Sequence, residues 1–473
     1  MTILATEREH WQGFLQAIDP MRFGTLKAIW EFLRVSELML LDIIKGRPEN
    51  PALAGKGDPE CGHFLHCLNY PHPQLAALVG ADSIAQTAWD LLAHEAKPRS
   101  ALEQGYFENL KAATNMRPIV GSDGAIYGFS QYEALDFRKI LALTNLITTF
   151  VHGRHSFGST PYIGELAPDT DGTVRLGMVA DWGTGSYGQN AGPAVAGMKQ
   201  LAQLNCNYLF HLGDVYYAGT GRAPYYPENE VIGNFTQLWP QLAGAGRSFA
   251  LNSNHEMYSG GNGYFPLTLG SSLFSHQQMT SYFALTFGKW VILGLDSAYN
   301  APLTSLYLSG ALGAKQIAWI QQYGESIGGY GGKKVLVLTH HEGQNFQGDA
   351  VTALHDEVAL AIGRAPDVWY WGHLHNGIAY SNASASGKQG VKARCIGHSA
   401  VPFGVASGLQ DSGGQPIPSV DYFARTPSPE GGNRVLNGFA TLELSAAGGI
   451  AEAFYEVGKP NPAWRSVNGI RFV

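Results

Sequence analysis

Five short blocks of the sequence carry side chains that bind metal ions, and each block directly follows an apolar run. They are Val179-Ala180-Asp181-Trp182-Gly183, Gly213-Asp214-Val215-Tyr216-Tyr217, Ser253-Asn254-His255-Glu256, Leu338-Thr339-His340-His341 and Gly372-His373-Leu374-His375. A two-metal site uses such donors, because one carboxylate can bridge both ions while imidazoles and oxygens complete each shell. Together the blocks predict a dinuclear metal site.

Taken singly, each block also has an ordinary structural interpretation. An aspartate after a strand commonly caps a helix or forms a turn. His340 and His341 are adjacent, so both cannot point the same way from the end of a strand. The sequence leaves open which of these two histidines is the ligand, and we favour His340. The ordered occurrence of all five blocks, each after a predicted strand, is what favours the metal site.

The blocks need a scaffold that brings distant segments together, and the chain after Val174 has the pattern of an α/β layered sheet. Helices are expected at Pro193–Leu204 and Lys315–Tyr323. Loops after the strands of such a sheet open at a common edge, where ligand sites form. Short apolar runs predict strands at Val174–Ala180, Tyr208–Leu212, Ser248–Asn252, Trp290–Leu295, Lys334–Thr339, Val368–Trp371, Lys392–Ile396, Gly438–Leu444 and Glu452–Val457.

The first part of the chain is predicted to be mainly helical. Apolar residues recur at helical spacing near residues 26–44, 82–97 and 136–151. Their polar faces are not rich in Lys or Arg, which favours core packing over a membrane surface. Gly, Pro, Asp and Thr cluster in Ser156–Gly172. We therefore predict a helical region of unknown role over residues 1–165 and a second domain with a β-rich tail over residues 166–473.

Composition limits the possible partners and locations. The 473 residues contain 31 Lys and Arg against 38 Asp and Glu, a net charge of −7, which argues against binding to a nucleic-acid backbone. We find neither a signal peptide nor an apolar run long enough to span a membrane, so we expect a cytoplasmic protein, with leaderless export left open. The oligomeric state is also left open.

The cysteines indicate no disulfide framework. Four are scattered along the chain, at Cys61, Cys67, Cys206 and Cys395. A structural zinc site near Cys61 and Cys67, with His63 and His66, is a weaker hypothesis, because the spacing is not that of a standard zinc site.

The ordered blocks resemble those of the calcineurin-like metallophosphoesterase superfamily. Gly183 stands where a histidine is usual, and Tyr217 lies three residues after Asp214, which looks like the purple acid phosphatase branch, where a tyrosine supplies a phenolate to Fe(III). The resemblance covers about Val174 to Val401. It implies the metallophosphoesterase fold, an α/β two-sheet β-sandwich flanked by helices, here preceded by the mainly helical N-terminal region.

The resemblance also implies roles for individual residues. One ion would be held by Asp181, Asp214, Tyr217 and His375, and the second by Asp214, Asn254, His340 and His373. His255 would lie over the phosphoryl group as a catalytic residue beside the bridging Asp214, and would either stabilise the transition state or protonate the leaving oxygen. Substrate contacts are expected from His255, from His341 and, separately from the resemblance, from Tyr258 beside the Gly-rich loop after the third block. Two departures stand out, because Ser253 replaces the usual Gly and Glu342 stands where Pro often follows.

The implied activity is metal-dependent hydrolysis of small phosphate esters, with a metal-bound hydroxide as nucleophile. The implied cofactors are two metal ions, Fe(III) with Fe(II), Zn or Mn. Monoesters are slightly favoured. Phosphodiesters, including nucleotide or lipid head-group diesters, are the alternative within the enzyme class, and a non-catalytic scaffold on the same fold is the alternative from another class.

Overall fold

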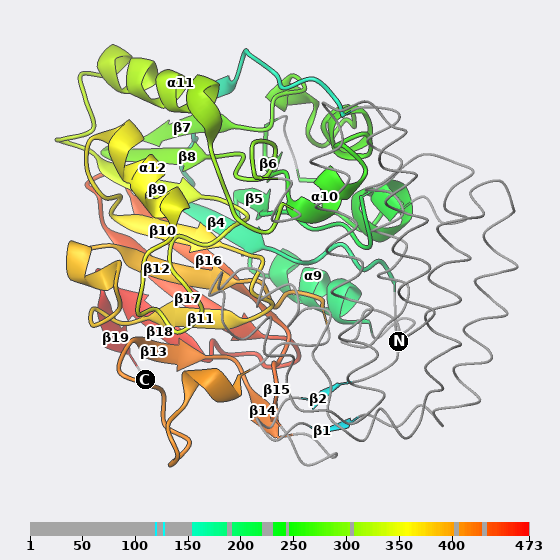
Figure 1. The fold of residues 1–473 in the computed structure, drawn as a ribbon, viewed down its shortest axis with the longest axis vertical. Helices are drawn as coiled ribbons and strands as arrows, with labels where there is room; N and C mark the ends of the chain where they lie inside the picture. Colours follow the sequence, from blue (N-terminus) through cyan, green and yellow to red (C-terminus); the bar gives the residue numbers. More distant parts are fainter. Residues whose placement is uncertain are drawn as a thin grey trace, which may run out of the picture.

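Two large mixed β-sheets pack face to face, with helices on their outer sides (Figure 1). The computed structural model describes residues 119–120, 126–127, 154–186, 192–219, 230–242, 246–302, 307–401, 406–427 and 433–472. Over these residues the architecture confirms the predicted α/β sandwich. The helices predicted at 26–44, 82–97 and 136–151, and the cysteines and histidines of residues 61–67, lie outside the described residues.

The larger sheet has eight strands. In spatial order they are β13 (Val420–Phe423), β11 (Gly377–Tyr380), β12 (Lys392–Ile396), β10 (Val368–Trp371), β9 (Lys334–Leu338), β8 (Trp290–Gly294), β7 (Phe283–Phe287) and β3 (Tyr162–Glu165). The four strands β12, β10, β9 and β8 run parallel, so their carboxyl ends meet at one edge.

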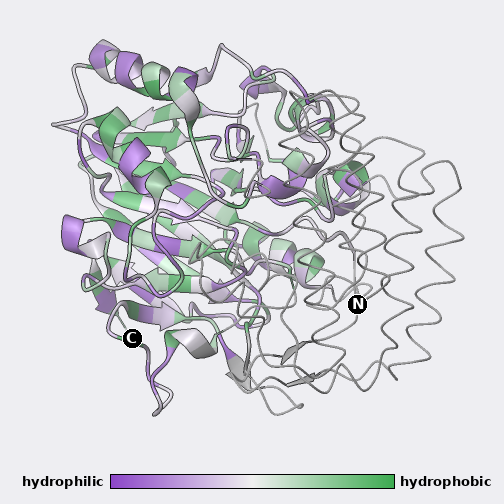
Figure 2. Cartoon of the chain, in the orientation of Figure 1, coloured by the Kyte–Doolittle hydropathy of each residue, from purple (hydrophilic) through white to green (hydrophobic). Residues whose placement is uncertain are grey.

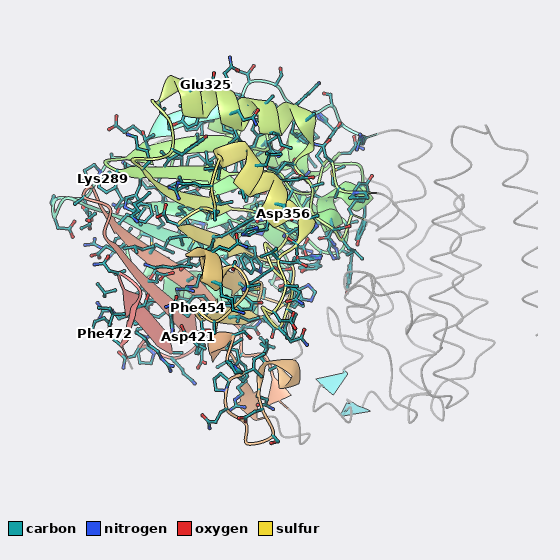
Figure 3. All side chains as sticks on the ribbon, turned by 60° about the vertical axis from the view of Figure 1, so that its left-hand side comes forward. Lys289, Glu325, Asp356, Asp421, Phe454 and Phe472 are labelled. Carbon is teal, nitrogen blue, oxygen red and sulfur yellow. The ribbon has the colours of Figure 1, made fainter. Side chains whose placement is uncertain are left out.

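The second sheet has seven strands. In spatial order they are β19 (Ile470–Phe472), β18 (Trp464–Val467), β17 (Ile450–Glu456), β16 (Gly438–Ser445), β4 (Thr173–Val179), β5 (Tyr208–His211) and β6 (Ser248–Ala250). Strands β4, β5 and β6 are parallel, whereas β16 to β19 form an antiparallel meander. Phe472 marks the outer edge of this sheet in Figure 3 and is 50% exposed.

The strands predicted after Val174 are all present, and several end one or two residues earlier than predicted. They end where the polar blocks begin, because the chain there leaves the sheet to form loops. Strands β7 and β11 and helix α12 were not predicted. Two-residue strands also pair, β1 (Ile119–Val120) with β2 (Ile126–Tyr127) and β14 (Thr426–Pro427) with β15 (Asn433–Arg434).

The outer faces of the sandwich are covered by α9 (Pro193–Ala202), α11 (Gly313–Ser326) and α12 (Ala353–Ile362), whereas the short helix α10 (Asn254–Tyr258) follows the end of β6. Further short helical turns are η2 (Val231–Thr236), η3 (Tyr264–Leu269), η4 (Ser275–Gln277), η6 (Gly387–Gln389) and η7 (Ser407–Leu409). Ile320 of α11 and Val358 of α12 pack in one cluster with Trp369 of β10. Figure 2 shows polar and apolar residues alternating along α11, as expected for a helix with one buried face. The exposed residues Glu325 and Asp356 lie on α11 and α12 (Figure 3).

A second apolar cluster fills the space between the sheets. It contains Phe210 and Phe249 from the seven-stranded sheet and Leu336 and Leu338 from the eight-stranded sheet, all at most 1% exposed. Burying each such side chain stabilises the fold by roughly 1.5–3 kcal/mol. The packing therefore holds the carboxyl ends of both sets of parallel strands close together.

One buried ion pair joins the two sheets. Arg394 of β12 donates to both carboxylate oxygens of Glu452 of β17, at 2.9 and 3.0 Å. Tyr370 and Ser466 donate to the same carboxylate, each at 2.8 Å. A buried pair satisfied in this way fixes how one sheet sits on the other, because losing either partner would leave an uncompensated charge.

Strand β3, just before residue 166, forms one edge of the eight-stranded sheet. Strand β3 ends at Glu165 and pairs in parallel with β7. The division into residues 1–165 and 166–473 stays a prediction. None of the helices in the described part of the chain has the length and apolarity needed to cross a bilayer.

Candidate metal centre

The predicted site residues meet where the parallel strands of both sheets end. Asp181 follows β4, Asp214 follows β5, and Asn254 begins the helix after β6. His340 follows β9, and His373 and His375 follow β10. Because these strands run parallel within each sheet, their carboxyl ends share an edge, and stacking of the sheets brings the two edges together.

The backbone at four of these positions has an uncommon conformation. Asp181, Asp214, His373 and His375 have positive φ angles of 54°, 75°, 64° and 50°. Non-glycine residues seldom adopt this left-handed region, although Asp and His do so more often than most. Such conformations persist where surrounding structure enforces them, and they cluster at functional sites.

The first group of candidate ligands consists of Asp181, Asp214 and His375, whose donor atoms all lie within 4.8 Å of one another. The Tyr216 hydroxyl lies among them. Its oxygen is 3.0 Å from Asp181 Oδ1, 2.8 Å from Asp214 Oδ2 and 3.1 Å from His375 Nε2. All four side chains are buried. The group thus brings two carboxylates, an imidazole and a phenol together.

The phenol in this group belongs to Tyr216, whereas the resemblance implies Tyr217 as the ligand. The backbone of Tyr217 is held instead, because its N–H donates to Glu230 Oε1 at 2.6 Å and its carbonyl oxygen contacts His255 Nδ1. The adjacent Tyr216 and Tyr217 in the sequence leave open which tyrosine is near the metal ligands, since either ring could reach the site from an irregular loop. Tyr216 is thus a residue beside the candidate ligands that the sequence does not single out, and the ligand role expected of Tyr217 stays a prediction.

His340 and Asn254 belong to a second group. His340 Nδ1 lies 2.9 Å from the carbonyl oxygen of Leu212, so in the neutral ring Nδ1 carries the hydrogen and donates it. His340 Nε2 then presents a lone pair, 2.8 Å from Asn254 Oδ1 and 3.2 Å from Asp214 Oδ1. Three lone-pair atoms converge with no hydrogen between them, which is the arrangement that a cation satisfies. Asn254 is oriented by its amide N–H, which donates to the Tyr258 hydroxyl at 3.2 Å.

His341 has different surroundings from His340. Its Nδ1 lies 2.8 Å from the Ser297 hydroxyl, and its Nε2 lies 2.7 Å from the carbonyl oxygen of Tyr307. His340, His341 and His373 do form a close trio, with donor atoms within 4.8 Å of one another. Both nitrogens of His341 nevertheless have partners within the protein, which favours His340 as the ligand.

His373 lies beside His340, and Gly183 lies against the backbone of Val215. The ring of His373 lies 5.1 Å from that of His340, and its backbone N–H donates to Asp181 Oδ2 at 2.8 Å. A side chain added at Gly183 would come within 2.6 Å of the Val215 Cα atom. No histidine fits at Gly183 in this backbone, in keeping with the phenol that lies in the first group.

Asp214 lies between the two groups. Its Oδ2 faces Tyr216 and its Oδ1 faces His340. His255 borders it, with Nε2 3.9 Å from Asp214 Oδ2 and a side chain that is 14% exposed. Tyr258 is 1% exposed. The contacts expected of His255, His341 and Tyr258 with substrate stay predictions.

Burial and mutual repulsion shift the pKa values of these acids. Burial raises the pKa of Asp181 well above its usual range, and the Asp214 carboxylate adds to this effect. Burial also acts to raise the pKa of Asp214, but the positive charge that His340 and His255 carry when protonated, with hydrogen bonds from Asp181 and Ser253, outweighs it and lowers that pKa. Burial, with the two carboxylates beside it, raises the pKa of Tyr216. A bound metal cation reverses the raised values, because its charge favours ionised ligands.

The described residues thus form a two-sheet α/β sandwich whose acids and histidines meet at the carboxyl edge of its parallel strands. No protein-family model matches the sequence, and no curated protein matches it significantly.

Three solved structures similar to this chain share 12–13% sequence identity with it. The GAP50 anchor of the Plasmodium inner membrane complex is 12% identical with a TM-score of 0.43, covering 62% of this chain and 88% of that one. Purple acid phosphatase PPD1 from yellow lupin (Lupinus luteus) seeds is 13% identical with a TM-score of 0.42, covering 64% of this chain and 54% of that one. A dimetal phosphatase from Danio rerio is 12% identical with a TM-score of 0.40, covering 62% and 98%. At such values the likeness assigns no function.

Proposed function

We propose that this protein hydrolyses phosphate esters at a dinuclear metal site. The observation that carries the proposal is the position of Asp214, a buried carboxylate with one oxygen in each of two ligand groups. A shared carboxylate of this kind is the central element of two-metal sites that act on phosphate esters. The resemblance of the five sequence blocks to those of metallophosphoesterases supports the same conclusion.

The donor set suits two cations. The first ion would be held by Asp181, Asp214, His375 and the Tyr216 hydroxyl, and the second by Asp214, Asn254, His340 and His373. When bound, the two ions would supply positive charge to the phosphoryl oxygens and acidify water. Iron in the first position, with iron, zinc or manganese in the second, follows from the resemblance and from the phenol.

His255 is proposed as the residue that protonates the leaving oxygen. Its Nδ1 faces the carbonyl oxygen of Tyr217, which fixes the hydrogen on Nδ1 and turns Nε2 toward the Asp214 side of the site. Partial exposure lets substrate reach the ring, whereas Asp214 beside it is fully buried. A general acid needs only hydrogen-bond reach to the leaving oxygen.

The substrates are proposed to be small phosphate esters, with monoesters slightly favoured over diesters. Hydrolysis of p-nitrophenyl phosphate and of bis(p-nitrophenyl) phosphate, measured side by side, tests this directly. Turnover should fall to background in Asn254→Ala, because the second ion loses an oxygen ligand. Asn207→Ala is the matched control, since Asn207 accepts a hydrogen bond from the backbone of Arg175, far from the ligand groups in the fold.

The outcomes separate the candidate functions. Faster turnover of the diester would identify a phosphodiesterase. Absence of turnover in protein that contains two metal ions would contradict the proposed hydrolysis of these esters and favour a non-catalytic scaffold. His255→Ala should lower kcat about 10²- to 10⁴-fold, the usual range for loss of a general acid, while the metal content stays at two ions per chain. Loss of metal from that variant would contradict the role given to His255.

A further inference from the structure

Ser253 is a buried serine directly before Asn254, at a position where the resemblance leads one to expect glycine. Its side chain is 0% exposed. It ends the loop after β6 and caps α10, accepting hydrogen bonds from the backbone N–H groups of His255 and Glu256. Its φ of −142° and ψ of 175° are ordinary extended values. The backbone therefore does not require glycine here.

The Ser253 hydroxyl contacts two buried carboxylates. Its oxygen lies 2.5 Å from Asp214 Oδ1 and also contacts Glu256 Oε2. A hydroxyl carries one hydrogen, so it donates to one carboxylate oxygen at a time. Which oxygen receives that hydrogen follows from the other donors around each carboxylate.

Asp214 Oδ1 needs this donor more than Glu256 Oε2 does. Glu256 Oε2 already accepts the backbone N–H of Asp214 at 3.3 Å. Asp214 Oδ1 faces the lone pair of His340 Nε2 at 3.2 Å, and the Tyr216 hydroxyl contacts the other oxygen, Oδ2. Among the contacts around Asp214 Oδ1, the Ser253 hydroxyl thus supplies the donated hydrogen.

We propose that Ser253 is a positioning residue for the second metal ion, because its hydroxyl holds Asp214 Oδ1 in the direction of His340 and Asn254. Hydrogen bonds of this kind orient metal ligands, and their loss typically weakens metal binding 10- to 100-fold. The inference rests on the proposed dinuclear site. It adds that the two ions depend on Ser253 unequally, since the hydroxyl touches only the oxygen that faces the second group.

Ser253 packs closely against Gly213. A Cβ atom placed on Gly213 would come within 2.7 Å of the Ser253 Cβ atom, so the two residues are in close contact. The informative variants are therefore smaller ones. Ser253→Gly removes the hydroxyl and stays compatible with a helix N-cap, whereas Ser253→Ala removes the hydroxyl and is a poor cap.

The test measures how many ions each protein retains after dialysis against graded chelator, using metal analysis and Mn²⁺ or Zn²⁺ as the probe. Wild-type protein should retain two ions. Ser253→Gly and Ser253→Ala should both retain the first ion and release the second at about 10- to 100-fold lower chelator strength. Excess metal should restore their activity, which a general loss of folding would not allow.

Ser281→Ala is the matched control, because Ser281 is equally buried and donates to Asp296, a carboxylate outside both ligand groups. It should keep both ions. Two ions held by Ser253→Gly as tightly as by the wild type would overturn the inference. Wild-type protein that binds fewer than two ions would overturn the proposed function itself, so the two failures are distinguishable.

Discussion

The two adjacent tyrosines after Asp214 make different contacts, so the structure distinguishes their roles. Tyr216 and Tyr217 are both buried, at 4% exposure each. Only the hydroxyl of Tyr216 lies within hydrogen-bond distance of Asp181 and Asp214 among the contacts that the described residues show. Tyr217 anchors the loop through its backbone. Substitution of Tyr216 therefore tests the ligand role, and the same substitution at Tyr217 is the control.

In protein loaded with ferric iron, Tyr216→Phe should abolish the visible absorption of an Fe(III)–phenolate, because the ring left behind has no oxygen to bind. Tyr217→Phe should keep the band, since the described contacts of Asp181 and Asp214 include the hydroxyl of Tyr216 and not that of Tyr217. Absorption spectra of the two variants at equal iron content show which tyrosine supplies the phenolate. A band lost only in Tyr217→Phe would return the ligand role to that residue.

The adjacent histidines provide a second comparison. His340→Ala should lose the second ion and reduce turnover to background, because Nε2 of His340 converges with Asp214 and Asn254. His341→Ala should keep both ions and lower the free energy of unfolding by about 1–3 kcal/mol, since the Ser297 hydroxyl and the Tyr307 carbonyl lose their partner. Metal analysis and urea unfolding measure these effects. Metal loss in His341→Ala alone would reverse the assignment.

At the scale of elements, the segment after β12 supports the end of β4 across the two sheets. The Ser399 N–H donates to the Ala180 carbonyl oxygen at 3.3 Å, and the Ala180 N–H donates to the Ser399 hydroxyl at 3.2 Å. Gly397 packs against the next residue, Asp181. A Cβ atom on Gly397 would lie 2.9 Å from both Asp181 Oδ2 and the backbone nitrogen of His375.

Gly397→Ala should therefore displace a ligand without removing one. The added methyl group must push Asp181 or His375 aside, at a cost of about 1–3 kcal/mol for overpacking. We expect a lower melting temperature together with weaker binding of the first ion, measured by metal analysis. Gly332→Ala, where an added Cβ meets nothing within 4 Å, is the control and should change neither. Full metal affinity in Gly397→Ala would show that the segment does not support the site.

At the scale of the whole molecule, the contact between the sheets contains a buried histidine. His398 is 0% exposed, and its ring stacks on that of Phe454 of β17, with 6.3 Å between the ring centroids. It abuts Gly377 of β11 and Gly438 of β16, so it touches both sheets. Burial lowers the pKa of His398 from 6.5 to about 4. The folded state therefore holds this ring neutral where the unfolded chain would protonate it.

This lowered pKa predicts loss of stability in acid. Above pH 6.5 the ring is neutral in both states, and as the pH falls toward about 4 only the unfolded state binds the proton. The free energy of unfolding should decrease by about 2 kcal/mol between about pH 7 and about pH 5 from this group alone. His398→Leu should show a correspondingly smaller decrease, measured by urea unfolding with chelator present at both pH values. An unchanged pH dependence in that variant would contradict the prediction.

Much of the fold could be predicted from local pattern. Strand β10 is a continuous apolar run, β5 and β9 are apolar at all but one position, and all three are almost fully buried, which suits strands covered on both faces. Pro193 marks the start of α9. Strand β3 was harder to recognise, because it is short and alternates between half-buried and exposed residues. Strand β11 lies directly after the His373–His375 block, whose ligand pattern obscured a strand signal.

Residue types and their order along the chain were enough to predict which chemistry is available and roughly where it lies. Asp181, Asp214, Asn254 and the histidines could be proposed from the sequence, because residue type and position after a strand are local properties. Tertiary structure alone decided that Tyr216 lies in the first group and that His340 and His341 have different partners. It also decided that Ser253 contacts Asp214. These outcomes depend on which atoms of distant segments meet, since a hydrogen bond or a ligand set is defined by geometry within a few ångströms that no local pattern specifies.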